Sequence, residues 1–75
     1  MPKPQLVITE HALQRAAERH ITDIEIIEAL AHGVKVKSYR YPGTWTATSS
    51  LITVAYRIVG RTVELLTCYR EHNHG

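Results

Sequence analysis

The residues best suited to chemistry lie in one short stretch near the start of the chain, residues 9–21. On an α-helix, His11, Arg15 and Arg19 are spaced four residues apart, so they form one row along one face. An imidazole titrates near neutral pH, and a guanidinium group binds phosphate through paired hydrogen bonds. The row can therefore bind a phosphate and move a proton, with the histidine as general acid or base and the arginines around the phosphate.

A fourth cation near the other end of the chain can complete such a site, and the predicted catalytic set is His11, Arg15, Arg19 and Arg70. The same row has a second interpretation. Glu18 can pair with either arginine of the row and neutralise it, and the stem of Arg19 can simply cover the core. The residues alone leave both interpretations open.

A second set of candidates surrounds the Pro-Gly turn at residues 41–44. The predicted RNA contacts are Lys35, Lys37, Arg40, Tyr41 and Trp45. Cations can follow a phosphate backbone, and aromatic rings can stack on unpaired bases. Lysines on an edge strand also prevent aggregation, and aromatic residues beside a turn also close one end of a small core. These alternatives stay open as well.

Cys68, His72 and His74 are the strongest metal candidates, but they lack a fourth ligand, so the sequence predicts no metal and no cofactor. Cys68 is the single cysteine, which excludes an intramolecular disulfide. Together with the lack of a signal-peptide pattern, this favours a reducing cytoplasm. No apolar run approaches the roughly 18 residues that span a bilayer, so no membrane association is expected.

The 75 residues are expected to form one domain, residues 1–75, with frayed tails at 1–6 and 71–75. The net charge of +2 is too small to imply a nucleic-acid partner by itself. Its distribution is uneven, because the second predicted helix is acidic and the segment after it is basic.

Two helices are expected in the first half of the chain. Thr9 is a good N-cap for the first helix, and Thr22 with Glu25 forms the capping-box pattern of the second. Gly33 is expected as a left-handed C-cap. The predicted buried faces are apolar and comprise Ala12, Leu13, Ala16 and Ala17 in the first helix and Ile24, Ile26, Ile27, Leu30 and Ala31 in the second.

Period-two patterning after residue 33 predicts strands at 34–39, 51–59 and 62–69, the last two joined by a two-residue turn at Gly60-Arg61. Residues 46–50 extend the second strand or form a separate one. The turn fixes a register in which Ile58, Tyr56, Val54 and Ile52 face Val63, Leu65, Thr67 and Tyr69 on the helix side. On the other side, Arg57 pairs with Glu64 and Thr53 with Cys68.

The predicted fold class is therefore α+β, a two-layer domain with two N-terminal helices packed on a three-to-four-stranded antiparallel sheet.

The opening His11-Ala12-x-x-Arg15-Ala16-x-Glu18-Arg19-x-Ile21 and the closing Leu66-Thr67-Cys68-Tyr69-Arg70 resemble the domain of unknown function 4258 family. That family is grouped with barnase, EndoU, colicin and RelE-like ribonucleases and toxins. The resemblance implies a RelE- or barnase-like fold that cleaves or binds RNA without metal. His20 stands where a glycine is common in the family, which bears on the geometry of the helix–helix corner.

Two functions follow as hypotheses. The first is an RNA-directed, toxin-like ribonuclease or a degenerate RNA binder. The second is a non-catalytic module that binds a protein through an exposed strand edge or the acidic second helix. The candidate partners are RNA, an antitoxin or another protein, and the oligomeric state is left open. The first hypothesis requires the predicted catalytic residues to converge on one concavity, whereas the second requires an apolar or edge-strand surface elsewhere.

Overall fold

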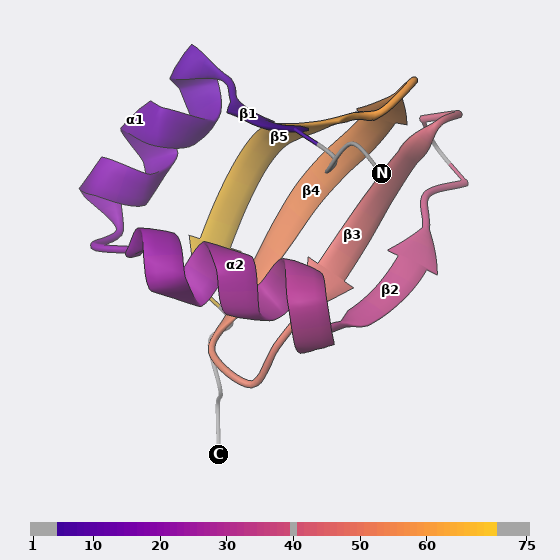
Figure 1. Ribbon diagram of the computed structural model, residues 1–75. Coiled ribbons are helices and arrows are strands. Elements are labelled where there is room, and N and C mark those ends of the chain that lie inside the picture. The colour runs from indigo at the N-terminus through magenta and orange to yellow at the C-terminus, as the bar shows by residue number, and fades with distance from the viewer. Residues whose placement is uncertain (1–4, 40, 71–75) are drawn as a thin grey trace.

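The computed structural model describes residues 5–39 and 41–70. The fold is α+β, and Figure 1 shows both helices in front of the same face of one mixed sheet. The strand order in this sheet is β1-β5-β4-β3-β2. The elements in chain order are β1 (Gln5–Ile8), α1 (Glu10–Glu18), α2 (Asp23–His32), β2 (Val34–Lys37), β3 (Thr44–Thr48), β4 (Ile52–Val59) and β5 (Thr62–Arg70).

The predicted sheet of three to four antiparallel strands was wrong in number and in direction. Strand β1 forms a fifth strand, parallel to β5, with Leu6 beside Val63 and Ile8 beside Leu65. Gln5 and Leu6 belong to the segment that was expected to be a frayed tail. Four residues without alternation carry almost no periodic signal, so only the pairing with the distant β5 reveals this strand. Residues 44–48 form a separate strand, which answers the question left open for 46–50.

Both predicted helix starts are confirmed. The Thr9 side chain accepts a hydrogen bond from the Ala12 amide, and Thr22 and Glu25 form a reciprocal capping box. Thr9 also fastens α1 to the sheet, because its hydroxyl donates to the carbonyl oxygen of Leu65 at 2.7 Å. Each cap therefore starts its helix, and the first one also positions the helix against β5.

Gly33 does end α2, but the predicted left-handed cap was wrong. Its backbone is extended, with φ −71° and ψ 163°. The glycine is explained by crowding, because a Cβ here would lie 2.9 Å from the carbonyl oxygen of Thr48 and closer still to that of Ala29. Gly33 thus lets the end of α2 approach β3.

The two predicted turns are confirmed. The Thr44 amide donates to the Tyr41 carbonyl oxygen, with Gly43 at φ 81°, as a type II turn requires. Strands β4 and β5 meet at Gly60-Arg61, with Ile58 opposite Val63.

The predicted hairpin register is correct from the turn to the pair Tyr56–Leu65 and wrong beyond it. An irregularity at Ala55/Tyr56 leaves Leu66 without a partner residue and shifts the register, so that Val54 faces Cys68 instead of Thr67. Such a bulge moves each following side chain to the other face of the sheet. Cys68 is therefore buried, while Tyr69, expected on the helix side, is 41% exposed.

The core lies between the helices and the sheet and consists of small helix residues packed on aliphatic strand residues. Its buried apolar members are Ala12, Ala16, Ile21, Ile26, Ala29, Ala47, Ile52, Val54, Tyr56, Leu65 and Cys68. Several residues expected on the buried helix faces are exposed instead, namely Leu13, Ala17, Ile24, Ile27 and Ala31. The predicted helix faces were too broad, because each helix contacts the sheet along a narrow line.

His20 provides a test of the helix corner. Its φ of 55° places an L-residue in the left-handed region, which costs about 1–2 kcal/mol. We expect His20→Gly to raise the free energy of unfolding by roughly 0.5–1 kcal/mol after the extra chain entropy of glycine is subtracted. Urea melts measure this change. His32→Gly, at the end of α2, is the control and should give no gain; a loss of stability in His20→Gly would contradict this account of the corner.

Candidate functional site

The side chain of Arg70 holds the corner between the two helices. Its Nε donates to the Arg19 carbonyl oxygen at 2.9 Å, and Nη2 donates to the His20 carbonyl oxygen. Its Nη1 also lies 3.1 Å from the carboxylate of Glu25. Arg70, at the end of β5, therefore binds two elements at the same time. It binds the backbone carbonyls that follow α1 and the carboxylate of Glu25 in the first turn of α2.

Arg19 makes the reciprocal contact. Its Nη1 donates to the Cys68 carbonyl oxygen at 2.9 Å, so that α1 and β5 are joined in both directions. We call the group of Arg19, Glu25 and Arg70 the corner clamp. In this arrangement both arginines bind the protein's own backbone.

The predicted catalytic residues are therefore only partly brought together. Arg19 and Arg70 meet at the corner clamp, whereas His11 lies exposed near the opposite end of α1. Arg19 follows His11 by eight positions, which is about 12 Å along the helix axis. Arg15 is paired with Glu18 at 2.8 Å, the neutralising contact that the second interpretation of the row contained.

The predicted RNA contacts are divided between surface and core. Lys35 and Lys37 are exposed on the edge strand β2, and Tyr41 is 61% exposed beyond it. Trp45 packs against the hydrophobic core, as the alternative interpretation held. Arg40 lies outside the described residues. Tyr39, a further aromatic residue beside this turn, is 99% exposed.

Cys68 has no features of a reactive thiol. It is fully buried, and burial raises the pKa of the thiol, with the charge of Arg19 acting weakly in the opposite direction. The two histidines grouped with it, His72 and His74, lie outside the described residues. Within residues 5–39 and 41–70, no cluster of three or more His, Cys, Asp or Glu side chains is placed to hold a metal ion. None of the helices in this part of the chain is long and apolar enough to cross a membrane.

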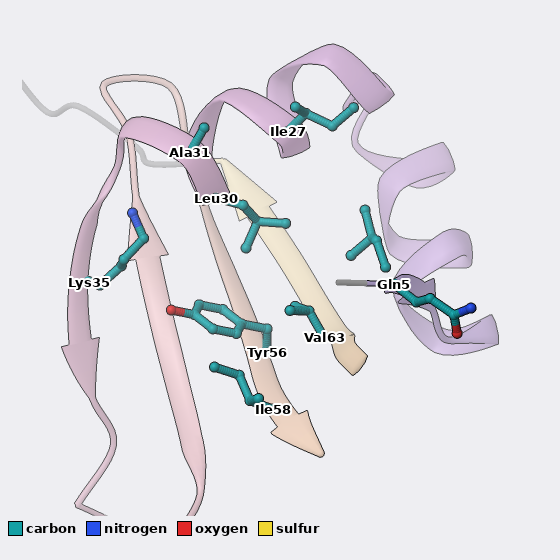
Figure 2. Close-up of a pocket in the computed structure, with 9 residues that line it drawn as sticks. Gln5, Ile27, Leu30, Ala31, Lys35, Tyr56, Ile58 and Val63 are labelled. Carbon is teal, nitrogen blue, oxygen red and sulfur yellow. The ribbon is translucent and has the colours of Figure 1, made fainter. Parts of the chain in front are cut away.

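A concave surface lies elsewhere, between α2 and the hairpin end of the sheet. We call it the apolar groove; its volume is about 470 Å³, and it is lined by Gln5, Leu6, Ile27, Leu30, Ala31, Lys35, Tyr56, Ile58 and Val63. Figure 2 shows Leu30 on the helix side, facing Tyr56, Val63 and Ile58 on the sheet. Lys35 and Gln5 lie at opposite ends of the groove in this view. None of the predicted catalytic residues lines this groove.

The groove is open because α2 crosses only part of the sheet. In Figure 1, the half of the sheet near the β4–β5 turn has no helix in front of it. The side chains there are partly exposed despite being apolar, with Leu6 at 41%, Ile27 at 55% and Ile58 at 55%. A set of exposed aliphatic side chains around one concavity is typical of a binding surface.

The sequence analysis assigned most of these residues to the core and so did not predict the groove. Tyr56 and Leu65 are indeed buried, but Ile58 is not, because neither α1 nor α2 crosses the end of the sheet near the β4–β5 turn. The available signal was a mismatch in length: the apolar face of the hairpin extends farther than a ten-residue helix can cover.

The comparisons with known proteins agree with this architecture. One chain of the crystallised toxin–antitoxin complex RelBE2 from Mycobacterium tuberculosis superimposes with a TM-score of 0.67 over 93% of this chain and 100% of that chain. The two sequences are 17% identical, so the similarity is one of fold. The protein thus shares its α+β fold with one chain of this toxin–antitoxin complex.

The sequence itself defines the family. Residues 8–74 match the family described as "Domain of unknown function (DUF4258)", and the chain belongs to it. The search of curated proteins gives no match. The family resemblance inferred from the opening and closing motifs is therefore confirmed.

The corner clamp predicts a dependence of stability on acid. Hydrogen bonds from the Thr22 backbone and then from Arg70 hold the pKa of Glu25 below its ordinary value. A lowered folded-state pKa adds stability above about pH 4.3, the usual pKa of glutamate, and this stability is lost as the pH falls through the folded-state pKa. We expect Glu25→Gln to lower the midpoint temperature of unfolding at pH 7. The difference between the midpoint temperatures at pH 7 and pH 3 should be smaller for this variant than for the wild-type chain. Glu28→Gln, on the exposed part of the same helix, is the matched control; equal acid sensitivity in wild type and Glu25→Gln would contradict the role of the clamp.

Proposed function

We propose that this protein acts by binding a partner protein through the apolar groove, in the manner of a toxin–antitoxin component. The observation that carries the proposal is the set of exposed aliphatic side chains on both sides of one concavity. The neighbour of similar fold is a chain of a toxin–antitoxin complex, which supports a protein partner for this fold.

The side chains that line the groove fit a protein contact better than a catalytic site for phosphate chemistry. The groove carries aliphatic side chains from α2, β1, β4 and β5, and Lys35 is its one charged lining residue. A catalytic site for phosphate chemistry requires several cations and a proton-transfer group around one point. Apolar surface removed from water contributes roughly 25 cal/mol per Å² before the entropy lost on association is subtracted, so aliphatic side chains can drive a protein contact.

Site-specific photo-crosslinking in cells tests the proposal. A photoreactive amino acid placed at Ile58 should give a discrete adduct with one partner protein, because Ile58 faces the groove. The same amino acid at Leu51, which is 57% exposed in the loop before β4, is the matched control and should give none. The purified partner should then bind the wild-type chain and lose affinity at least about tenfold for Ile58→Asp. The proposal fails if Ile58 and Leu51 give the same adducts, or if Ile58→Asp binds as well as wild type.

A second function, RNA binding, is favoured by one observation. Lys37 is exposed on β2, and Tyr39 and Tyr41 are exposed beyond it, so a cation and two rings follow one another along a short segment. Such a segment suits the phosphates and bases of a single strand. In this hypothesis, cleavage remains a further proposal, with His11 as the exposed acid or base.

A titration with single-stranded RNA tests this second function. The apparent affinity should fall with added salt, and the double variant Lys37→Ala/Tyr39→Ala should bind more weakly and reduce the salt slope by about one. Arg61→Ala removes an exposed cation at the β4–β5 turn and should leave the affinity nearly unchanged. Equal binding by both variants, or no binding at low salt, would exclude the β2 segment as an RNA site.

A further inference from the structure

We infer that the occupant of the apolar groove is an amphipathic α-helix with acidic side chains along one border. This inference rests on the proposed function and adds the secondary structure and the charge of the partner segment. It follows from the hydrogen bonding of the groove floor and from the single charged residue that lines the groove.

The floor of the groove lies on inner strands of the sheet, away from its two edges. Its central side chains, Ile58 and Val63, belong to β4 and β5. Strand β5 pairs with β1 on one side and β4 on the other, and β4 pairs with β5 and, as far as Arg57, with β3. A segment that enters the groove must therefore satisfy its own backbone N–H and C=O groups, because buried unpaired groups are costly. A helix does so within itself, whereas an added strand would have to pair with β1 or β2, the edge strands at the two rims of the groove, and would leave Ile58 and Val63 on the floor uncovered.

The shape of the groove leads to the same conclusion. Its wall is the side of α2 that carries Ile27, Leu30 and Ala31, at helical spacings of three and four residues. A second helix laid beside α2 would cover Ile58 and Val63 and extend the helical layer over the bare half of the sheet. Helices held in such grooves present anchors at positions i, i+3, i+4 and i+7.

The acidic border of the partner helix is inferred from Lys35. It is the only charged residue among the nine that line the groove, and its Nζ makes one hydrogen bond, to the Gly33 carbonyl oxygen at 3.1 Å. An ammonium group has three donors, so Lys35 can also bind a carboxylate of the partner. Lys37 lies two residues along the same face of β2 and adds a second positive charge at this border.

An unbiased library of displayed 16-residue peptides tests the inference. Selection on the wild-type chain, with counter-selection on Ile58→Asp, should enrich sequences with aliphatic residues at i, i+3, i+4 and i+7 and with Asp or Glu along one border. The enriched peptide should lose at least about tenfold in affinity when a proline is placed at its centre. The Lys35→Glu protein should bind the acidic peptide at least about fivefold more weakly than wild type does. It should bind more tightly than wild type to a version of the peptide in which the border glutamates are replaced by lysine. Ile27→Glu, on the exposed side of α2, provides a second groove variant and should weaken both peptides.

Four outcomes of the peptide experiments would overturn the inference. These are enriched peptides with alternating apolar residues, tolerance of the central proline, indifference to Lys35→Glu, and no enrichment over the counter-selecting variant. Self-association that Ile58→Asp abolishes, measured by sedimentation without peptide, would identify a second copy as the occupant and would also overturn it. The proposed function fails separately, in the crosslinking experiment, so a partner that crosslinks at Ile58 without a helical acidic segment would refute the inference alone.

Discussion

The position of the helices depends on the contacts of Arg70. The strand that carries this residue ends beside the corner between α1 and α2, where backbone carbonyls of Arg19 and His20 point outward without helical partners. A guanidinium group has five donors in one plane, so it can bind both carbonyls and Glu25 together, which a lysine cannot do in the same geometry. With the corner held at the end of β5, α2 crosses β4 and β3 near that end and leaves the hairpin end bare. The open groove is a consequence of where the clamp sits.

The bulge in β5 makes this arrangement possible. Without it, Tyr69 and Thr67 would face the helices, and the bulky ring would occupy the place that Cys68 fills against Ala12. The bulge also leaves the carbonyls of Leu65 and Leu66 within reach of the Thr9 hydroxyl, at 2.7 and 3.4 Å. One extra residue thus sets the buried face of β5 and the attachment point of α1.

What the sequence predicted correctly is local, and what it did not predict is long-range. The capping box at Thr22, the type II turn at Gly43 and the β4–β5 turn at Gly60 each follow from residues within a few positions of one another. The parallel pairing of β1 with β5 joins segments that are more than fifty residues apart. The bulge at Leu66 lies within the β4–β5 pair, but the contact that it makes with Thr9 at the start of α1 also spans more than fifty residues. The same holds for the arginines, because a spacing of four residues on α1 cannot show that Arg19 binds the carbonyl of Cys68. Sequence periodicity identified a row of cations, but the contacts of each cation were set by the tertiary fold.

The motif and the groove therefore have different physical roles. Arg19 and Arg70 belong to the opening and closing motifs, and their contacts are with the backbone of the corner, so these two positions specify the fold. The residues that expose apolar surface, such as Leu6 and Ile58, lie outside both motifs and contribute to one continuous groove. Substitution of an exposed groove residue should change the folding stability of the unbound chain little, because the side chain is already half in water. The same substitution changes the surface that a partner contacts. A fold held by its motif arginines can therefore change its partner by changing the groove while the corner clamp stays the same.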